Sequence, residues 1–262
     1  MVENHPPLRI QFDQQYMKKV SNFADSVGDM NASGIPEPHI PLWGPLYEYA
    51  PLRVGIIGRD TRSWGDLPEF LRTVKESPLK AIHRNENEFN SLAFTDWTNN
   101  FGKTFWDTSM KILAGLHGIA DWKRLKRREE LTVLRSFFWA NVNSIERYAV
   151  SPKSNGVSWD VWRKIKDASE KHLDSFSAIL DIFTPHVVVV MNWEPGDHFL
   201  DLNIKWNNLG DHLIEARHEA TGTYILATAH PTWLNQNSLY DTTITRIVEK
   251  ATQAIKETSN LT

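Results

Sequence analysis

Four short apolar runs constrain the fold of this chain more than any other feature. They read RVGIIG at 53–58, SFFWANV at 136–142, HVVVVMNW at 186–193 and TYILATAH at 223–230. Each run is rich in β-branched or aromatic residues and is apolar at successive positions. That pattern is typical of strands buried on both faces of a parallel sheet. The runs therefore predict four core strands.

Helical patterns lie between these runs. Apolar residues spaced three and four apart predict helices over 159–183, with Ser158 as N-cap, over 104–122 and over 244–255, and a further helix is expected over 8–27. Strands that alternate with helices indicate crossover connections. We expect an α/β fold, with three layers (α/β/α) around a central four-stranded, mainly parallel sheet.

The length of 262 residues suits one domain of this class with additions. We expect a single domain over 1–262, with 1–50 as an N-terminal extension of helix and loop and 75–104 as an insertion. The stretch PEPHIPLWGP at 36–45 is predicted to be loop, because its four prolines interrupt regular backbone hydrogen bonding.

Composition excludes several classes of protein. The chain has no cysteine, so disulfides, cysteine-ligated zinc and iron–sulfur clusters are excluded. The N-terminus lacks the apolar core of a secretory signal, and VVVVM at 187–191 is too short to span a bilayer. We expect a cytoplasmic protein, a monomer by preference, with no membrane partner, no metal and no cofactor.

The charge pattern gives two opposing indications about nucleic acid. A net charge of −3 argues mildly against such a partner, because phosphate contacts favour basic surfaces. The run WKRLKRR at 122–128 nevertheless holds five basic residues, of which Lys123, Arg124 and Arg127 are candidate contacts to DNA. The alternative is that this run is a solvated helix end.

Polar side chains follow all four predicted strands. Ligands of open parallel sheets bind beyond the carboxyl ends of the strands. The four exits carry Asp60 after the first strand, Asn141 and Asn143 at the second, Asn192 at the third and His230 at the fourth. These residues together predict a functional site.

The chemistry open to these side chains is acid–base and hydrogen-bonding chemistry. Asp60 can orient water or stabilise a developing cation, or it can cap the helix that follows. His230 can donate to developing negative charge, or it can satisfy backbone groups. The amide of Asn141 matches the hydrogen-bonding edge of a pyrimidine, or it bridges backbone groups. The chain holds neither the G-x-S-x-G elbow of serine hydrolases nor a phosphate-binding P-loop.

Three of these exits resemble the motifs of the uracil-DNA glycosylase superfamily. GRDT runs from Gly58 to Thr61, FWAN ends at Asn141, and HPTWL runs from His230 to Leu234. The family has G-Q-D-P-Y at a strand end, an Asn closing the second core strand, and H-P-S-x-x-L after the last strand. Order and spacing agree over residues 50–240.

The resemblance implies a role for each matching position. Asp60 is similar to the acidic residue that positions water and stabilises the cationic sugar, and His230 to the histidine that supports negative charge on the departing base. No lysine lies in a motif position, which implies a monofunctional reaction that leaves an abasic site. The other implied roles are base reading by Asn141 with Asn143 beside it, stacking on the base by Phe70, a wedge into the DNA stack by Leu234, and DNA contacts by Trp233 and Thr232.

The sequence departs from the family beside the acidic residue. Arg59 replaces the Gln, Thr61 the Pro, and Arg62 the Tyr that crowds position C5 of the pyrimidine in uracil enzymes. Arg59, Arg62 and Trp64 offer donors and a stacking face to a polar substituent such as a sugar. We therefore hypothesise that the base is a bulky 5-substituted pyrimidine, such as glucosylated hydroxymethylcytosine in phage DNA, which would make this an antiviral defence enzyme.

Three alternatives stay open. One is a uracil or mismatch DNA glycosylase in repair. Another is a non-catalytic protein that binds modified nucleic acid. The third is an enzyme that acts on a small nucleoside.

Overall fold

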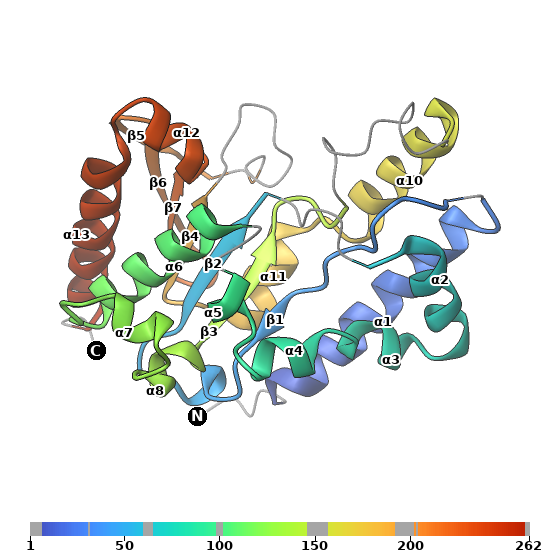
Figure 1. The fold of residues 1–262 in the computed structure, drawn as a ribbon, viewed down its shortest axis with the longest axis horizontal. Helices are drawn as coiled ribbons and strands as arrows, with labels where there is room; N and C mark the ends of the chain where they lie inside the picture. The colour runs from blue at the N-terminus through green and yellow to red at the C-terminus, as the bar shows by residue number, and fades with distance from the viewer. Residues whose placement is uncertain are drawn as a thin grey trace. The chain divides into compact units, whose positions relative to one another are not determined.

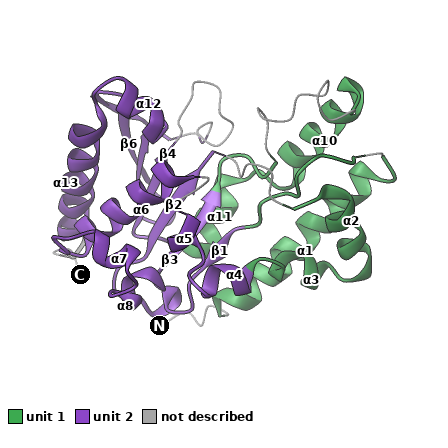
Figure 2. Cartoon of the chain, viewed as in Figure 1, with its two compact units in different colours: residues 1–40, 60–85, 141–183 green, residues 41–59, 86–140, 184–262 purple. Residues whose placement is uncertain are grey.

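The computed structural model describes residues 7–30, 32–59, 65–97, 102–145, 157–191, 202 and 204–259. The protein is α/β, as predicted (Figure 1). The chain forms two compact units, each built from three segments (Figure 2). Unit 1 comprises 1–40, 60–85 and 141–183, and unit 2 comprises 41–59, 86–140 and 184–262. The expectation of a single domain stays a prediction.

A mixed seven-stranded sheet forms the centre of unit 2, in the order β1-β3-β2-β4-β7-β6-β5. The four predicted strands are present as β2, β3, β4 and β7, but the prediction of a four-stranded sheet is wrong. β2 runs parallel to β4 and β4 parallel to β7, whereas β1, β5 and β6 pair antiparallel with their neighbours. The strands are β1 Leu42–Trp43, β2 Val54–Gly58, β3 Phe137–Asn141, β4 Val187–Met191, β5 Asn207–Gly210, β6 Leu213–His218 and β7 Thr223–Thr228.

Of the three additional strands, β1 and β5 lie at the edges of the sheet and β6 lies next to β5. β1 interrupts the predicted loop at 36–45, where Leu42 pairs with Trp139 of β3. β5 and β6 form a hairpin whose inner strand pairs with β7, and β5 itself is largely exposed. Edge strands need only one apolar face or none, so they lack the continuous apolar run by which central strands are recognised.

The central strands are buried along their whole length. Val187 of β4 pairs with Val54 on one side and with Tyr224 on the other. A Cβ atom on Gly55 of β2 would lie 2.3 Å from the ring of Phe138 in β3. Glycine at this position therefore allows the close approach of the Phe138 ring.

The helices of unit 2 pack on the sheet and on one another. α6 contacts β2, α13 contacts β4 and β7, and the two helices contact each other. α6 ends at Leu116, before the predicted end at 122, and Gly118 follows in the left-handed region with φ 69°. The elements are η1 Tyr47–Tyr49, α4 Glu86–Asn90, α5 Phe94–Trp97, α6 Lys103–Leu116, α7 Lys123–Lys126, α8 Leu131–Leu134, α12 Pro231–Gln236 and α13 Tyr240–Ser259.

Aromatic side chains fill the core beside α6. Phe94 stacks on Trp106 with ring centroids 5.0 Å apart, and Trp106 meets Trp139 of β3 edge-on, also at 5.0 Å. Phe89 packs against Phe137 at 5.4 Å. Phe89 and Phe94 come from the predicted insertion at 75–104, and they are part of the core of unit 2.

The described part of unit 1 is helical and consists of α1 Leu8–Val27, α2 Leu67–Glu76, α3 Pro78–His83, α10 Trp159–His172 and α11 Phe176–Phe183. The prediction for 8–27 is confirmed, as is Ser158, whose hydroxyl accepts from the Val161 N–H at 3.2 Å. The single helix predicted over 159–183 is wrong, because the chain breaks at 173–175. There Asp174 accepts from Ser169 and from the backbone of Ser144. Among the described residues, no helix combines the length and apolarity needed to cross a bilayer.

Candidate functional site

The carboxyl ends of β2, β4 and β7 lie at one edge of the sheet in unit 2, because these strands are parallel neighbours. Arg59 follows β2 and is half-buried. Asp60, Thr61, Arg62 and Trp64 lie outside the described residues, as does the segment 192–200 after β4. The exit from β7 is described throughout, and it carries His230.

His230 has a defined structural role at this exit. It is the N-cap of α12, and its Nδ1 atom accepts a hydrogen bond from the Thr232 N–H at 3.2 Å. The alternative that His230 satisfies a backbone group is therefore confirmed. This bond also fixes the tautomer. An Nδ1 atom that accepts cannot carry the proton of the neutral ring, so the proton resides on Nε2, which is a donor.

The helix after the first motif has its own cap. Asp66 is the N-cap of α2, and its carboxylate accepts from the Glu69 N–H at 3.3 Å. Pro68 follows within the first turn, where a missing N–H costs nothing. The alternative role for Asp60 as the cap of this helix is therefore wrong.

Two asparagines close β3. Asn141 is the last residue of the strand and is 6% exposed, and Asn143 is 2% exposed. The Nδ2 atom of Asn143 is buried and has no hydrogen-bond partner among the described residues. An unsatisfied buried amide costs about 1–3 kcal/mol. The Asn143 amide at this strand exit, unpaired among the described residues, is therefore suited to donate to an acceptor atom of a ligand.

Phe70 does not lie where base stacking would require it. It is 1% exposed and packs on the inner face of α2 with Leu67, Leu71 and Val74. The positions 67, 70, 71 and 74 follow the helical repeat, so this ring belongs to the core of unit 1. The prediction that Phe70 stacks on a base is wrong for this structure.

Leu234 is also a core residue. It is fully buried on α12, one turn after the buried Pro231. Thr232 and Trp233 occupy the opposite, exposed side of the same helix, and Trp233 is 36% exposed. The predicted wedge role of Leu234 is wrong for this conformation, and Trp233 is the apolar side chain of the segment that faces solvent.

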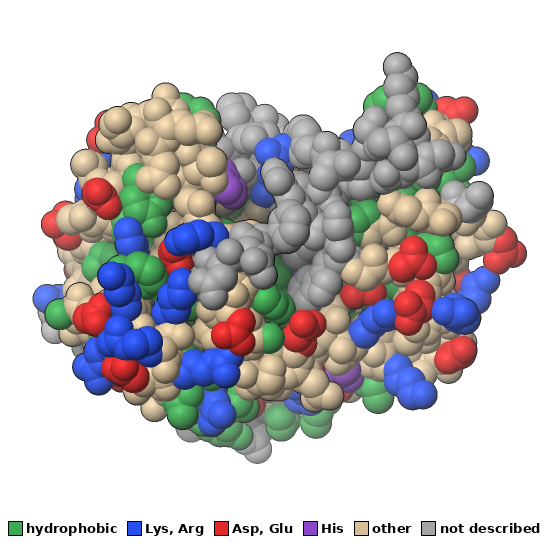
Figure 3. Space-filling view, in the orientation of Figure 1, with side chains coloured by type: hydrophobic (Ala, Val, Ile, Leu, Met, Phe, Trp, Pro, Cys, Tyr) green, Lys and Arg blue, Asp and Glu red, His purple; other side chains and the backbone are tan. Residues whose placement is uncertain are grey.

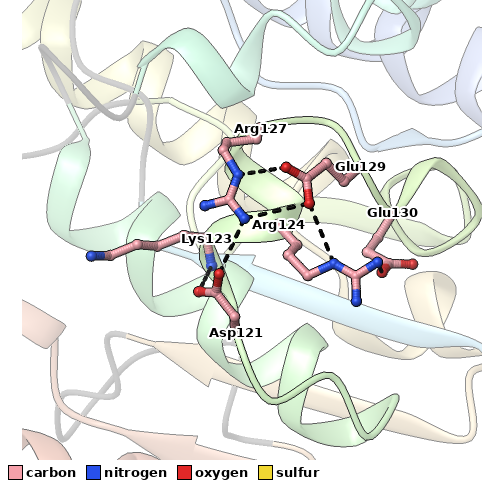
Figure 4. A network of polar contacts seen from close by, with 6 residues as sticks. All are labelled: Asp121, Lys123, Arg124, Arg127, Glu129 and Glu130. Carbon is pink, nitrogen blue, oxygen red and sulfur yellow. Dashed lines mark hydrogen bonds and ion pairs between the residues drawn. The ribbon is translucent and has the colours of Figure 1, made fainter.

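The basic run around α7 is neutralised by neighbouring carboxylates (Figure 4). Arg127 donates to Glu129 at 2.6 Å and to Asp121 at 3.1 Å, and Arg124 bonds Glu129 at 3.4 Å. The Arg127 guanidinium lowers the pKa of both Asp121 and Glu129 through these hydrogen bonds. The six residues of the network are Asp121, Lys123, Arg124, Arg127, Glu129 and Glu130.

This α7 network carries three basic and three acidic side chains, so its net charge is zero. The acids flank the basic run in the sequence itself, at DWKRLKRREE. The arrangement favours the solvated helix end over the predicted DNA contacts of Lys123, Arg124 and Arg127, since phosphate binding requires unneutralised positive charge.

A surface hollow of about 260 Å³ lies at the other end of β7. Its polar groups bond one another. The Tyr224 hydroxyl donates to Glu215, and Gln253 donates to Glu257 at 2.9 Å. Burial first, and the Glu215 carboxylate second, raise the pKa of Tyr224. None of the predicted site residues lines this hollow.

Glu37 is a buried acid that the sequence reading did not single out. It is 3% exposed, accepts from Asn85 at 2.8 Å and forms an ion pair with Arg84 at 3.2 Å. Burial raises its pKa, although Asn85 and Arg84 partly offset the effect. A Cβ atom on Gly65 would lie 2.2 Å from the Glu37 carboxyl carbon, and Gly65 has φ +64°. Glu37 thus packs directly against Gly65, four residues after the end of the GRDT motif.

His212 was likewise missed. Its ring lies edge-on to Trp233 with centroids 4.3 Å apart. The two residues are far apart in sequence, so no local pattern indicates this contact.

Among the described residues, no group of three or more acidic or histidine side chains is placed to hold a metal ion. No protein-family model matches the sequence, and no curated protein matches it significantly. The chemistry of the site is therefore inferred from its residues.

Proposed function

We propose that this protein is a monofunctional DNA glycosylase that flips a modified pyrimidine out of the duplex and hydrolyses its glycosidic bond. The observation that carries this proposal is the fixed tautomer of His230, whose Nδ1 atom accepts from Thr232 at the exit of β7. A neutral histidine with the proton on Nε2 is a donor suited to the oxygen of a departing base.

The bond breaks toward a cationic sugar and an anionic base, so two charges must be stabilised. Donors and anions aimed at developing charge are among the strongest contributions to catalysis. In the proposed mechanism His230 donates a hydrogen bond from Nε2 to the base, and the carboxylate of Asp60 stabilises the sugar and orients the attacking water. As the water oxygen bonds to the sugar carbon, Asp60 accepts the proton that the water loses, and this proton then passes to the departed anionic base. No proton need leave His230, because a hydrogen bond to the base oxygen suffices.

Recognition of the base is assigned to the asparagines of β3. Asn143 holds a buried amide donor without a partner among the described residues, which supports a role in binding an acceptor on the base. Asn141, two residues earlier, is the second base-reading candidate. Arg59, Arg62 and Trp64 are proposed to accommodate the substituent at C5.

Contact with DNA is assigned to Trp233 and Thr232 rather than to Leu234. Flipping a nucleotide costs a few kcal/mol, and a side chain that fills the gap offsets part of it. The exposed Trp233 can fill such a gap, whereas the buried Leu234 cannot. A three-layer arrangement like that of uracil-DNA glycosylases belongs to this proposal.

A second candidate function is the hydrolysis of a free nucleoside. The observation that favours it is the neutral α7 network, in which carboxylates pair with Arg124 and Arg127 of the most basic stretch of the sequence. Such an enzyme would use the same acid–base pair on a substrate that needs no flipping.

A panel of substrates separates these functions. The protein is incubated with plain, uracil-containing and glucosyl-hydroxymethylcytosine DNA and with the corresponding free nucleosides. The proposal predicts alkali-labile sites in the glucosylated DNA and no release from nucleosides. Release from nucleosides alone supports the second candidate, cleavage of uracil DNA alone supports a repair enzyme, and tight binding without any release supports a non-catalytic binder.

A further inference from the structure

The ring pair formed by His212 and Trp233 lies beyond the carboxyl end of β7, at the edge where open parallel sheets bind ligands. Leu213 pairs with Thr228, the last residue of β7, so the hairpin tip at 211–212 extends beyond the carboxyl end of that strand. Trp233 follows from α12, just after the same strand end. Both side chains are exposed, and their rings meet edge-on with centroids 4.3 Å apart.

The hairpin tip is held in a conformation that its side chains disfavour. Gly210 pairs with Leu213, which leaves Asp211 and His212 as a two-residue turn with φ of 51° and 55°. Such turns favour glycine or asparagine, because a Cβ atom is crowded at positive φ. Arg246 of α13 fastens the tip by an ion pair to Asp211 at 2.9 Å. Backbone strain of this kind gathers at functional sites, where the surrounding structure maintains it.

The surroundings of the ring pair are polar, and the charges of Asp211 and Arg246 beside it are paired with each other. The surface over α12 and the β5–β6 hairpin is largely tan in Figure 3, the colour of uncharged polar side chains and backbone. Among the described residues, Trp233 is the only exposed large apolar side chain on α12 or this hairpin. An apolar protein interface needs a wider patch. A phosphate contact needs cations, and Arg246 is already engaged. The exposed amides and hydroxyls are those of Asn207, Asn208, Thr232, Asn235, Gln236 and Asn237.

We propose that Trp233 and His212 form a stacking platform for an unpaired nucleobase beside the catalytic edge. Every base has a π-face, so an aromatic platform binds it with little sequence preference, while neighbouring amides hydrogen-bond its edge. His212 holds the indole ring from the side and is a positioning residue. The identity of the ligand as nucleic acid rests on the proposed function, but the platform needs no bond cleavage.

The test uses a duplex in which 2-aminopurine stands opposite an abasic analogue and no modified pyrimidine is present, so no turnover occurs. Stacking on the indole quenches the probe. We expect the wild-type protein to quench it and the Trp233→Ala variant to bind about tenfold more weakly. Trp159→Ala is the matched control, since Trp159 is 59% exposed and belongs to unit 1. A duplex with paired 2-aminopurine should show no quenching.

The His212→Gly variant distinguishes a loss of base stacking from a general loss of stability. Glycine relieves the left-handed turn, so the melting temperature should rise while quenching and affinity fall. Equal quenching by wild type and Trp233→Ala, or none by wild type, would overturn the platform. Equal quenching by the two proteins together with normal base excision by the wild type would overturn the platform and leave the glycosylase standing. Quenching by the wild type without any excision of modified bases would overturn the glycosylase and leave the platform standing.

Discussion

His230 has one observed role and one proposed role in the same ring. Its Nδ1 atom caps α12 and its Nε2 atom is the proposed donor to the leaving base. These roles can be separated, because asparagine is a good helix cap but has no group that reproduces an imidazole donor at the same distance from the backbone.

We predict that His230→Asn keeps the stability of the wild type, whereas His230→Ala loses about 1 kcal/mol through the lost cap. Both variants should release base about 10²–10³-fold more slowly, because a donor to developing charge is gone. Urea unfolding and single-turnover base release measure the two effects. A fully active His230→Asn variant would show that His230 only caps the helix.

Glu37 gives the stability a pH dependence. Its pKa is raised above the ordinary value of 4.5, with burial as the largest cause, so the folded state holds this proton more tightly than the unfolded state. The resulting stabilisation is present below the unfolded pKa and is lost as pH rises through the folded one.

We predict that Glu37→Gln gains stability relative to wild type as pH rises from about 4 to about 7, because glutamine stays neutral throughout. Thermal unfolding of both proteins across this range measures the difference. Glu69→Gln, which removes the exposed partner of Arg84, serves as the control. A difference that stays constant with pH, or shrinks as pH rises, would contradict the assignment to Glu37.

The contact between β2 and β3 is so close that it favours glycine at position 55. A Cβ atom on Gly55 would lie 2.3 Å from the Phe138 ring. We predict that Gly55→Ala destabilises unit 2 by about 1–3 kcal/mol through overpacking. The cost should be smaller in a Phe138→Leu background, where the ring is absent. A double-mutant cycle by urea unfolding measures this coupling, and additive effects would argue against the contact.

The elements that could be predicted are those whose signal is local. β2, β3, β4 and β7 are apolar on both faces, and α1 carries an amphipathic repeat along its length. β1 and β5 could not be predicted, because edge strands carry no such run. β6 was missed because its apolar run is broken by charged residues and the turn at Asp211 and His212 lacks the usual glycine. The break between α10 and α11 was hidden because the apolar spacing continues across 173–175, while Asp174 bonds distant Ser144.

The candidate site likewise contains some residues whose place could be predicted from the sequence and others whose place could not. His230 could be recognised from its position after an apolar run. Leu234 was misassigned, because a motif position does not report which side of a short helix faces the core. Phe70 was misassigned because the apolar repeat of α2 places its ring on the core side of that helix. The neutrality of the α7 network follows from contacts between acids and bases that a basic run alone conceals. The His212–Trp233 pair arises from tertiary folding, which brings a hairpin tip beside α12.

At the scale of the whole molecule, the fold places its central parallel strands where their carboxyl ends share one edge. In unit 2 the described residues of that edge include a histidine of fixed tautomer and an exposed aromatic pair. With a net charge of −3 and a neutral α7 network, the proposed binding of DNA would depend on a few specific contacts rather than on a broad basic surface.

Base release from one oligonucleotide tests the central claim most directly. Wild type, Asp60→Asn and His230→Asn are each incubated in single turnover with DNA that carries one glucosyl-hydroxymethylcytosine, and the freed base and alkali-labile sites are counted together. If the protein excises bases, the wild type will leave one abasic site per freed base. Both variants will be folded and almost inactive. Release by Asp60→Asn at the wild-type rate, or no free base from the wild type on any modified DNA, would contradict it.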